Sequence, residues 1–516
     1  MNWNFQRSKE RLASERARIQ QAGLNIQRLT REMDLANLSP TDARIVHGAH
    51  IYCHIANFSE VLNSPLMRRD DFKRLHRLLH ILRIEQRYTL QQVFDGDKIQ
   101  VQGPKFHGLL YKPYDDDPAL AWKSVLAAIA LKLAISDALP IVFPEYPKLL
   151  PSLGLSIGDC LVANIGARGE RELISVGGAA NHAAKIMNDI RPITITRDLY
   201  SNLDDERKEL FTASGTVYTL DLPSISDANL LLKDEGYAWN AERSSERMAR
   251  TRDDLPLDDI NSSVAQVRID FDLLGPKNMK TCSAASVFVD IDGYTATIDG
   301  LFEDQEDLGK ASQWLHLFRY EMRHVTVDRD AVAVQHQGDR LQALTHMPSD
   351  DEASAMRRAI ELCIDCNSSM EEVLNEYHAD LGKLHVAIGA DFGKTVAIRS
   401  GVRGDLDAGC LGHAVGRAEH LQFRSAGGQI TISKALYDIL DDEVIRQEFA
   451  LSADGNSYAA KGLTWTKIED LRKKRSYESK ASVGFDARSS GIVFGISGGK
   501  SPDVIPLKQT RPWGTE

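Results

Sequence analysis

The sequence predicts an α+β protein built from two homologous domains in tandem, preceded by an N-terminal helix. Three observations lead to this prediction. The chain repeats itself at an offset of 235 to 237 residues, each copy alternates β-type runs with helical stretches, and 43% hydrophobic with 26% charged residues is an ordinary globular composition. At 516 residues there is enough chain for two or three domains, each with its own core.

The repeat is carried by four separate pairs of segments. ITITRDLYSNLDDE at 193–206 returns as ITISKALYDILDDE at 430–443, an offset of 430 minus 193, or 237 residues. At offsets of 235 or 236, HIYCHIANFS pairs with VFVDIDGYT, QVQGPKF with QHQGDRL, and ISVGGAANHAAKI with GCLGHAVGRAEHL. Chance similarity does not keep register over four segments, and the period is far too long for a solenoid.

The copies define five expected parts of the chain. Within each copy the pattern is strand, helices, hairpin, then strand, helix and strand, which indicates helices packed on an antiparallel-rich sheet. The expected parts are an N-terminal helical segment (1–46), a first domain (47–225), a linker with a helical portion (226–279), a second domain (280–467) and a loosely held tail rich in Gly, Ser and Pro (468–516).

The N-terminal segment carries an apolar stripe at heptad spacing. Phe5, Leu12, Ile19, Ile26 and Met33 recur every seven residues over about four heptads. Two interpretations stay open, a helix docked on its own domain and a coiled coil that makes a homodimer.

Charge and apolar patterning restrict the partners. A net charge of −11 disfavours a general role in coating nucleic acid. The chain starts with MNWNFQRSKER, which lacks the apolar core of a secretory signal, and the run VLAAIAL at 125–131 is far short of a membrane span. The six scattered cysteines do not form a disulfide framework, so we expect a cytoplasmic protein with reduced thiols and no membrane partner.

Two aspartates of the second copy sit where strands end. Asp290 closes the apolar run SVFVDI, and Asp339 follows Gly338 at a tight turn between two β-type runs. With the backbone carbonyl of Ile291 they form an oxygen-only site that suits Mg²⁺ or Mn²⁺. Asp292 is expected to be an accessory or surface acid.

The ordered motifs resemble those of the class III nucleotidyl cyclases. VFVDIDGYT is similar to their first metal motif, QGDRL to their second, and LHVAIGADFGKTVA to the segment that follows. The resemblance covers both copies and implies ferredoxin-like domains that form a pseudo-heterodimer. It also implies that Asp290, Ile291 and Asp339 hold two divalent ions, Mn²⁺ or Mg²⁺, for attack of a ribose 3′-hydroxyl on the α-phosphate. Phe288, in the same strand, is expected to contact the substrate.

The first copy lacks these acids and keeps a different set. His54 stands in place of Asp290, and Pro104 in place of Asp339. GGAANHAAKI resembles the cyclase helix in which an Asn orients the ribose and a basic residue four positions later stabilises the phosphate. The resemblance therefore implies catalytic roles for Asn181 and Lys185, which share one helix face. The second copy has Gly and His at these two positions, so the losses are complementary and predict one working site between the domains.

Base and triphosphate contacts follow from the same resemblance. It places Gln100 and Ile174 against the base and Arg403 near the triphosphate. A Gln amide can donate and accept, so it suits cytosine, uracil or adenine. The N-terminal helix, GAHIYCHIANF and the twin-domain layout resemble the pyrimidine cyclases of bacterial antiphage (Pycsar) systems. This resemblance implies a CTP or UTP substrate, cyclic CMP favoured over cyclic UMP, and a separate effector protein activated by the product.

The same residues allow other functions. A purine cyclase in ordinary signalling and a non-catalytic nucleotide sensor remain alternatives, and the intact Asp290 and Asp339 pair argues against the sensor. A palm-type polymerase or diguanylate cyclase would show a GGDEF-like hairpin, which QGDRL does not supply.

Overall fold

A computed structural model gives the fold of the chain. It describes residues 3–35, 38–39, 41–63, 72–165, 172–187, 193–220, 224–301, 305–377 and 382–485. The first-half elements are α1 (Phe5–Ala22), β1 (Asn25–Arg28), β2 (Asp42–Ile55), α2 (Phe58–Asn63), α4 (Phe72–Tyr88), β3 (Asp97–Gln102), β4 (Lys105–Leu110), α5 (Asp117–Leu133), α6 (Leu139–Val142), β5 (Pro151–Ile165), β6 (Glu172–Val176), α7 (Gly178–Ile186), β7 (Ile193–Thr196), α8 (Arg197–Ser201), α9 (Asp205–Lys208), β8 (Phe211–Ser214) and β9 (Val217–Leu220).

The second half continues from residue 225. Its elements are α10 (Ile225–Asp234), α11 (Ala241–Asp253), β10 (Asn261–Val264), β11 (Asn278–Asp292), α12 (Tyr294–Asp299), α13 (Gln305–Asp328), β12 (Val332–Gln337), β13 (Arg340–Thr345), α14 (Glu352–Glu372), β14 (His385–Val402), β15 (Asp405–Leu411), α15 (His413–Arg424), β16 (Gln429–Ser433), α16 (Lys434–Asp438), α17 (Glu443–Glu448), β17 (Ala450–Leu451), β18 (Ser457–Lys461) and α18 (Trp465–Phe485).

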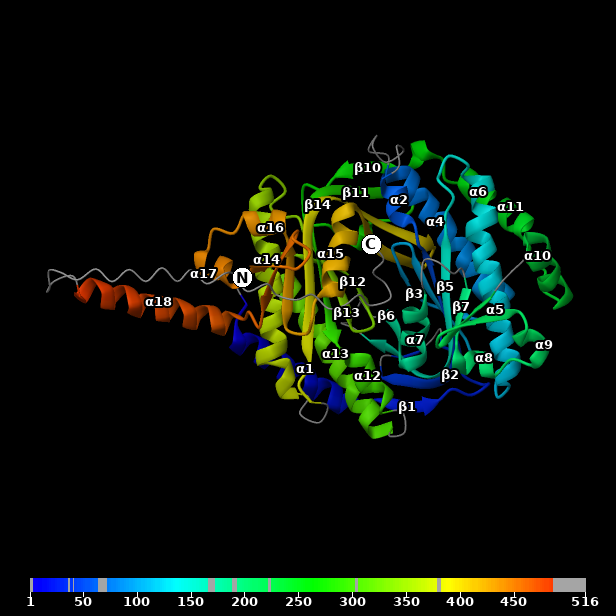
Figure 1. Cartoon of the computed structure of the whole chain (residues 1–516), viewed down its shortest axis with the longest axis horizontal. Helices are drawn as coiled ribbons and strands as arrows, with labels where there is room; N and C mark the ends of the chain where they lie inside the picture. Colours follow the sequence, from blue (N-terminus) through cyan, green and yellow to red (C-terminus); the bar gives the residue numbers. More distant parts are fainter. Residues whose placement is uncertain are drawn as a thin grey trace.

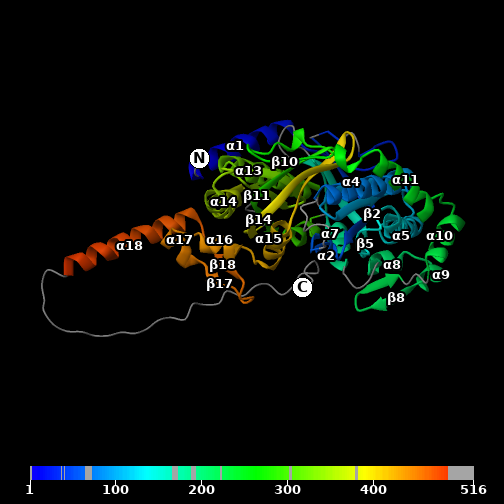
Figure 2. The same cartoon turned by 90° about the horizontal axis from the view of Figure 1, so that it is seen from above.

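Two sheets of the same topology lie side by side, each with helices on its faces (Figures 1 and 2). The strand order is β3-β4-β2-β5-β7-β9-β8 in the first and β12-β13-β11-β14-β16-β18-β17 in the second. In each sheet one further strand pairs with the long central strand and one with its antiparallel neighbour, β1 and β6 in the first and β10 and β15 in the second. This architecture confirms the predicted α+β fold with tandem domains.

The two sheets match residue by residue. His54 of β2 pairs with Ser152 of β5, and Asp290 of β11 pairs with Ala387 of β14, the same position of the second sheet. Each hairpin also carries a register shift at the same place, before Gln100 in β3 and before its counterpart in β12. The sequence repeat is therefore a repeat of backbone geometry.

Close packing of a helix on the central strand is repeated as well. A Cβ placed on Gly154 would lie 2.0 Å from the Ala183 carbonyl oxygen of α7, and one on Gly389 would lie 2.4 Å from the Ala418 oxygen of α15. Only glycine fits at such an approach. These contacts fix the two helices that flank the cleft between the domains.

The N-terminal helix is shorter than the heptad stripe suggested. It ends at Ala22, with Gly23 in the left-handed region (φ 71°), and Ile26 belongs to β1 rather than to a helix. The helix packs on α13 of the second half, where Arg11 contacts Glu321 at 2.7 Å (Figure 1). The stripe is therefore not one helix of four heptads, because the apolar residues beyond Ala22 pack as strand and loop. The homodimer stays a prediction.

The segment predicted as a linker repeats this N-terminal unit. α11 packs on α4 of the first half, where Arg247 contacts Glu85 at 2.6 Å, and β10 pairs with β11 as β1 pairs with β2. The sequence carries the signal, since WNFQRSKERLA at 3–13 returns as WNAERSSERMA at 239–249. We infer a repeat unit of about 236 residues whose N-terminal helix crosses to the other half, in place of a separate linker.

Paired contacts also join the halves at the cleft. Arg83 of α4 donates to the Ser400 carbonyl oxygen at 3.5 Å, and Arg319 of α13 donates to the Ile165 carbonyl oxygen at 3.2 Å. Both arginine side chains are buried. The two contacts are related by the same pseudo-two-fold axis as the sheets.

The apolar run predicted at 125–131 is part of a longer apolar helix. Asp117–Val142 forms α5, a π-helical turn and α6, and it is long and apolar enough to cross a membrane on length and composition alone. In the structure it is a core helix, because 72% of its apolar window is buried inside the first half.

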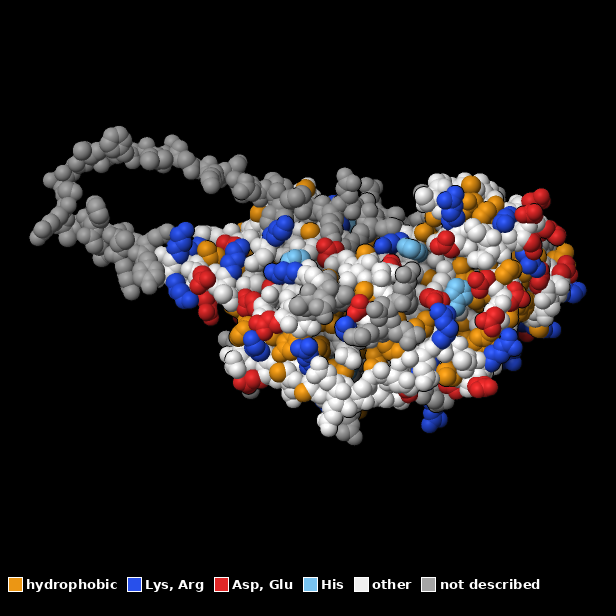
Figure 3. Space-filling model, turned by 90° about the horizontal axis from the view of Figure 1, so that it is seen from below, with side chains coloured by type: hydrophobic (Ala, Val, Ile, Leu, Met, Phe, Trp, Pro, Cys, Tyr) orange, Lys and Arg blue, Asp and Glu red, His pale blue; other side chains and the backbone are white. Residues whose placement is uncertain are grey.

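The predicted tail begins as a helix. α18 occupies 465–485 and projects from the second half (Figure 1), and residues 486–516 lie outside the described part. On the face shown in Figure 3, acidic and basic side chains of the described residues are interspersed.

Candidate active site

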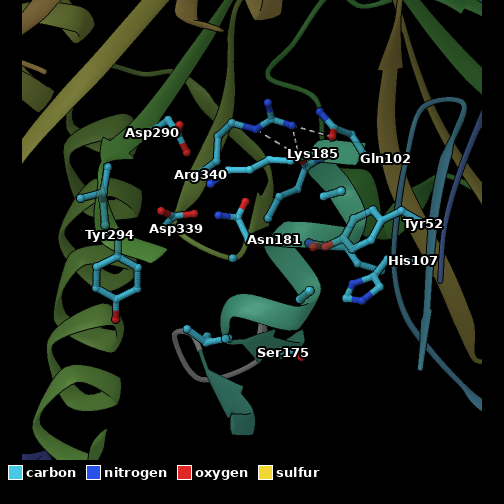
Figure 4. A pocket seen from close by; sticks show the side chains of 18 of the residues that line it. Tyr52, Gln102, His107, Ser175, Asn181, Lys185, Asp290, Tyr294, Asp339 and Arg340 are labelled. Carbon is cyan, nitrogen blue, oxygen red and sulfur yellow. Dashed lines mark hydrogen bonds between the residues drawn. The ribbon is translucent and has the colours of Figure 1, made fainter. Parts of the chain in front are cut away.

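A cavity of about 470 Å³ lies between the two halves. The first half lines it with β2, β3, β4 and α7, and the second half with β11, α12 and the β12–β13 turn (Figure 4). Its lining includes six of the nine predicted site residues, namely Gln100, Asn181, Lys185, Asp290, Ile291 and Asp339. The cleft is therefore composite, as the complementary losses predict.

Asp290 is held by a buried amide. The Nε2 of Gln422 on α15 donates to Oδ2 of Asp290 at 3.0 Å. Gln422 is 1% exposed, and its Oε1 has no hydrogen-bond partner among the described residues. The neighbouring Asp292 accepts instead from the backbone N–H of Gly427 at 3.0 Å. Asp290 and Asp292, the two acids of the VFVDIDGYT motif, are thus oriented by different partners.

Asp339 projects from the tight turn that joins β12 and β13. Gly338, in the left-handed region at φ 56°, makes that turn possible. Figure 4 shows the carboxylates of Asp290 and Asp339 on the same side of the cavity, with the Asn181 amide opposite them. Burial, reinforced by the Asp339 charge, raises the pKa of Tyr294 well above its usual value.

Asn181 and Lys185 lie on one face of α7, as the spacing predicts. Both line the cavity, and Lys185 is exposed. The start of this helix abuts the second half, because a Cβ on Gly178 would lie 2.6 Å from a carboxylate oxygen of Asp299. Burial raises the pKa of Asp299, and the nearby Lys185 charge opposes that rise. Contact with α12 thus places α7 against the second half, which carries Asp290 and Asp339.

Cations on the neighbouring strands were missed by the sequence analysis. Lys105 and Arg340 both line the cavity and both contact Glu419, at 2.7 and 3.0 Å. Burial opposes ionisation of Glu419, but these two cations lower its pKa to about 2. They occupy matching positions of QGPKF and QGDRL, so a basic residue in both copies was the available signal.

The other end of the cavity is a row of side chains on the first sheet. Tyr52 of β2 stacks on His107 of β4 with ring centroids 4.0 Å apart, and Gln100 of β3 is the cross-strand partner of His107 on its other side. Nδ1 of His50 lies 3.0 Å from Nε2 of His107. Neither Tyr52 nor the histidine pair was singled out from the sequence.

Three predicted residues lie away from the cavity lining. Ile174 is 1% exposed, and its side chain packs in the apolar core beside the interface, so the adjacent Ser175 lines the cavity instead. Phe288 is buried under the Arg340 guanidinium. Arg403 is exposed at the turn between β14 and β15. The alternation of side chains along a strand accounts for Ile174, since a shift of one residue reverses the face.

The pseudo-equivalent position in the first half has no carboxylate pair, since His54 and Pro104 stand in place of the two aspartates. His54 is half-buried, and desolvation of its ring lowers its pKa to about 3, so its imidazole is neutral. Lys105 and Glu419, which form an ion pair at 2.7 Å, both lie near enough to His54 to affect its pKa. The first-half position therefore lacks the ligands of a hard cation.

The donor set of the second half fits a hard divalent cation. Two carboxylates and a backbone carbonyl are oxygen ligands, and the buried side chain of Ile291 leaves only its main chain to face the cavity. No cluster of three or more His, Cys, Asp or Glu side chains suited to a metal occurs among the described residues. The remaining ligands must therefore come from a bound substrate or water, as is usual for Mg²⁺.

Comparisons with known proteins agree with this geometry. No protein-family model matches the chain. A solved class III adenylyl cyclase-like ATP-binding protein from Pseudomonas aeruginosa superposes with a TM-score of 0.75 at 23% identity, over 91% of this chain and 99% of that one. A curated uridylate cyclase of Pseudomonas aeruginosa is 28% identical, with 85% of this chain and 86% of that protein covered. The chain therefore has the fold of the class III adenylyl cyclase-like protein and is similar in sequence to a curated uridylate cyclase.

A second relative extends this similarity. A uridylate cyclase of a Rhizobium species is 24% identical, with 84% of this chain and 90% of that protein covered. At this coverage the matched region includes most of both halves of the chain. The class III fold accounts for the two matching sheets and for the composite cavity between them.

Proposed function

We propose that this class III cyclase homologue converts a pyrimidine nucleoside triphosphate to its 3′,5′-cyclic monophosphate and pyrophosphate. One observation carries the proposal. A single cavity brings Asp290 and Asp339 of the second half together with Asn181 and Lys185 of the first. The names of the curated relatives support pyrimidine chemistry.

Each half contributes one part of the proposed chemistry. Two Mn²⁺ or Mg²⁺ ions held by Asp290, Asp339 and the Ile291 carbonyl would lower the pKa of the ribose 3′-hydroxyl and neutralise the triphosphate. Asn181 orients the ribose so that its 3′-oxygen faces the α-phosphorus. Lys185 places a fixed positive charge where the five-coordinate phosphate gains negative charge. A lysine supplies this charge without the bidentate geometry of arginine.

Arg403 is left without a role in this proposal, because it is exposed on a hairpin turn outside the cavity lining. Lys105 and Arg340 instead bring positive charge to the cavity wall. Their ion pairs with Glu419 fix their positions before the anionic substrate arrives. Such preorganised charge favours binding of a triphosphate.

The proposal also covers the base of the substrate and the cellular role of the product. The cytosine preference implied by the resemblance to the antiphage pyrimidine cyclases stays a prediction, and the relatives named uridylate cyclase favour uracil. We propose that the cyclic nucleotide acts in the cytoplasm as an antiphage signal on a separate effector protein.

Product identification tests the activity. The full chain is incubated with Mn²⁺ and each of the four nucleoside triphosphates, and products are identified by mass spectrometry, with Asp339→Asn as the negative control. We expect a cyclic pyrimidine nucleotide and pyrophosphate from the wild type alone. Absence of turnover with all four nucleotides would overturn the enzyme assignment.

A nucleotide-binding protein without turnover is the second candidate. It is favoured by the printed description of the structural neighbour as an ATP-binding protein. In that case ATP would bind at micromolar concentration, and no cyclic product or pyrophosphate would form in the same incubation.

A further inference from the structure

The base end of the cavity carries hydrogen-bonding groups of fixed polarity. Three neighbouring strands place Gln100, His107 and Tyr52 in one cross-strand row, and all three line the cavity. Side chains directly opposite on paired strands have Cβ atoms about 5 Å apart, so the polar ends of two such side chains can converge on one base edge. The row is therefore a candidate reader of the base.

The polarity of Gln100 is set by the other half of the chain. Its Nε2 donates to the main-chain carbonyl oxygen of His336 in β12. A carbonyl oxygen only accepts, so the amide cannot turn its oxygen toward it. With Nε2 turned to His336, Oε1 is the acceptor that Gln100 can offer to the cavity. The contact thus favours the acceptor role over the donor role of this amide.

The polarity of His107 is set by His50. Burial lowers the pKa of His50 to about 3 and that of His107 well below its usual value, so both rings are neutral and share one proton between Nδ1 of His50 and Nε2 of His107. His50 is fully buried, and its Nε2 has no hydrogen-bond partner among the described residues. A buried N–H without a partner is rarer than a buried bare acceptor. The favoured tautomer therefore keeps the His50 proton on Nδ1 and leaves Nδ1–H as the donor that His107 can offer to the cavity.

We propose that Gln100 and His107 form a fixed acceptor–donor pair that reads the N3–H and O4 edge of uracil, with His50 as a positioning residue. This inference rests on the proposed pyrimidine cyclase function and names its base. Uracil offers a donor at N3 and an acceptor at O4, which complement Oε1 of Gln100 and Nδ1–H of His107. Cytosine offers the reverse pattern and would place two acceptors and two donors face to face.

The contrast with the second half shows that the pair is particular to this cavity. The positions that match His107 and His50 in the second sheet are Gln342 and Ser286, and Gln335 matches Gln100. There Gln335 and Gln342 are cross-strand partners, and no imidazole is present at the three matching positions. The histidine pair is thus no general requirement of the fold.

Substrate selectivity is the test. We expect the wild-type kcat/KM to favour UTP over CTP by about 10- to 100-fold, the discrimination of one well-placed hydrogen-bonded pair. His107→Phe keeps the stack on Tyr52 and removes the donor, so the UTP to CTP ratio should fall about tenfold, chiefly through loss with UTP. His50→Leu should lower the ratio by a smaller factor, because the tautomer is no longer fixed. His420→Phe, outside the cavity lining, is the matched control.

A purely structural role would lower kcat/KM equally for both nucleotides. Use of CTP as well as or better than UTP by the wild type, or an unchanged ratio in an active His107→Phe chain, would overturn the inference. Guanine shares the donor and acceptor pattern of uracil at N1 and O6, so GTP belongs in the panel, and preference for GTP over UTP also counts against it.

Binding separates this inference from the proposed activity. Equilibrium binding of UTP and CTP to the wild type and to His107→Phe is measured by calorimetry with Ca²⁺ as the divalent ion. A UTP preference that disappears in His107→Phe supports the base reader even if no nucleotide is turned over. Equal affinity for UTP and CTP in the wild type overturns it whatever the turnover.

Discussion

At the scale of single residues, the acids of the second half dominate the proposed chemistry. Asp339→Asn should lower cyclic nucleotide formation by about 10³-fold or more, because loss of a metal-binding carboxylate removes several kcal/mol of charge stabilisation. Pro104→Ala is the matched control, since Pro104 stands at the same position of the first copy. Steady-state rates of both variants give the comparison, and an Asp339→Asn chain within tenfold of the wild type would contradict the assignment.

Gln422 is predicted to act through Asp290. Replacement by Met, the residue at the matching position 187 of the first copy, should weaken Mn²⁺ binding about 10-fold, because the carboxylate loses the donor that orients it. Direct Mn²⁺ binding by electron paramagnetic resonance measures this without turnover. Unchanged Mn²⁺ affinity in a folded Gln422→Met chain would show that the hydrogen bond plays no part.

A surface histidine of the first half gives a pH prediction. Hydrogen bonding to Asp159 raises the pKa of His47 above its usual value. The stabilisation is therefore complete below the unfolded pKa of about 6.5 and disappears as the pH rises through the folded pKa. The melting temperature of the wild type should exceed that of His47→Gln at about pH 5.5, and the gap should narrow at about pH 9. A gap that widens with pH would reverse the assignment.

The sequence predicted most of the site at this scale and missed what depends on side-chain direction. Asp290, Asp339, Asn181 and Lys185 were predicted from their types and spacing, and all four line the cavity, while their roles stay predictions. The prediction of Ile174 was off by one position, because Ser175 lines the cavity. The face on which a side chain of a short strand lies is set by strand pairing rather than by composition. Gln422 could not be found, because a single amide on a helix has no pattern.

At the scale of elements, each crossing helix is anchored by a buried carboxylate. Glu321 is fully buried and accepts from Arg11 and Ser8 of α1, and Glu85 accepts from Arg247 and Ser244 of α11. These contacts tie the N-terminal segment of each repeat to the opposite half. One helix from each repeat therefore packs on the opposite half and holds the two halves together.

Breaking one anchor should destabilise the whole fold. Arg11→Met leaves Glu321 buried without its ionic partner, which costs about 3–5 kcal/mol of unfolding free energy. Chemical denaturation measures the loss, and Lys9→Met, at an exposed ion pair of the same helix, should leave stability unchanged. Equal stability of Arg11→Met and Lys9→Met would show that the contact contributes nothing.

The double variant Arg11→Met with Glu321→Leu extends this test. Replacement of both buried charges by apolar side chains of similar size should recover much of the loss. A double variant as unstable as the single one would indicate that the helix depends on other contacts.

The sequence predicted the sheet elements better than the crossing helices. Nearly continuous apolar runs such as SVFVDI located the central strands, because strands covered on both faces do not alternate apolar and polar residues. The heptad stripe suggested too long a helix, because the seven-residue spacing continued by chance into β1. The repeat of WNFQRSKERLA at 239–249 instead marks the helix that begins each repeat unit. Tertiary packing on α13, which no local pattern encodes, decided where α1 lies.

At the scale of the whole molecule, the chain is a pseudo-dimer whose cavity of about 470 Å³ is lined by both halves. The pseudo-equivalent position in the first half has no acids, because His54 and Pro104 stand in their places. The complementary losses could be predicted from sequence alone, because the repeat aligns each missing residue with a retained one. The ion pairs of Lys105 and Arg340 with Glu419 could not, since they depend on how strands of both halves meet α15.

Mixing two inactive chains tests the division of labour most directly. Cyclic nucleotide formation is measured for the wild type, Asp339→Asn, Asn181→Ala and an equimolar mixture of the two variants. We predict activity in the wild type alone, with losses of about 10³-fold for Asp339→Asn and about 10²- to 10³-fold for Asn181→Ala, and no recovery on mixing, because the site forms within one chain. Full activity of Asn181→Ala, or recovery in the mixture, would contradict the account.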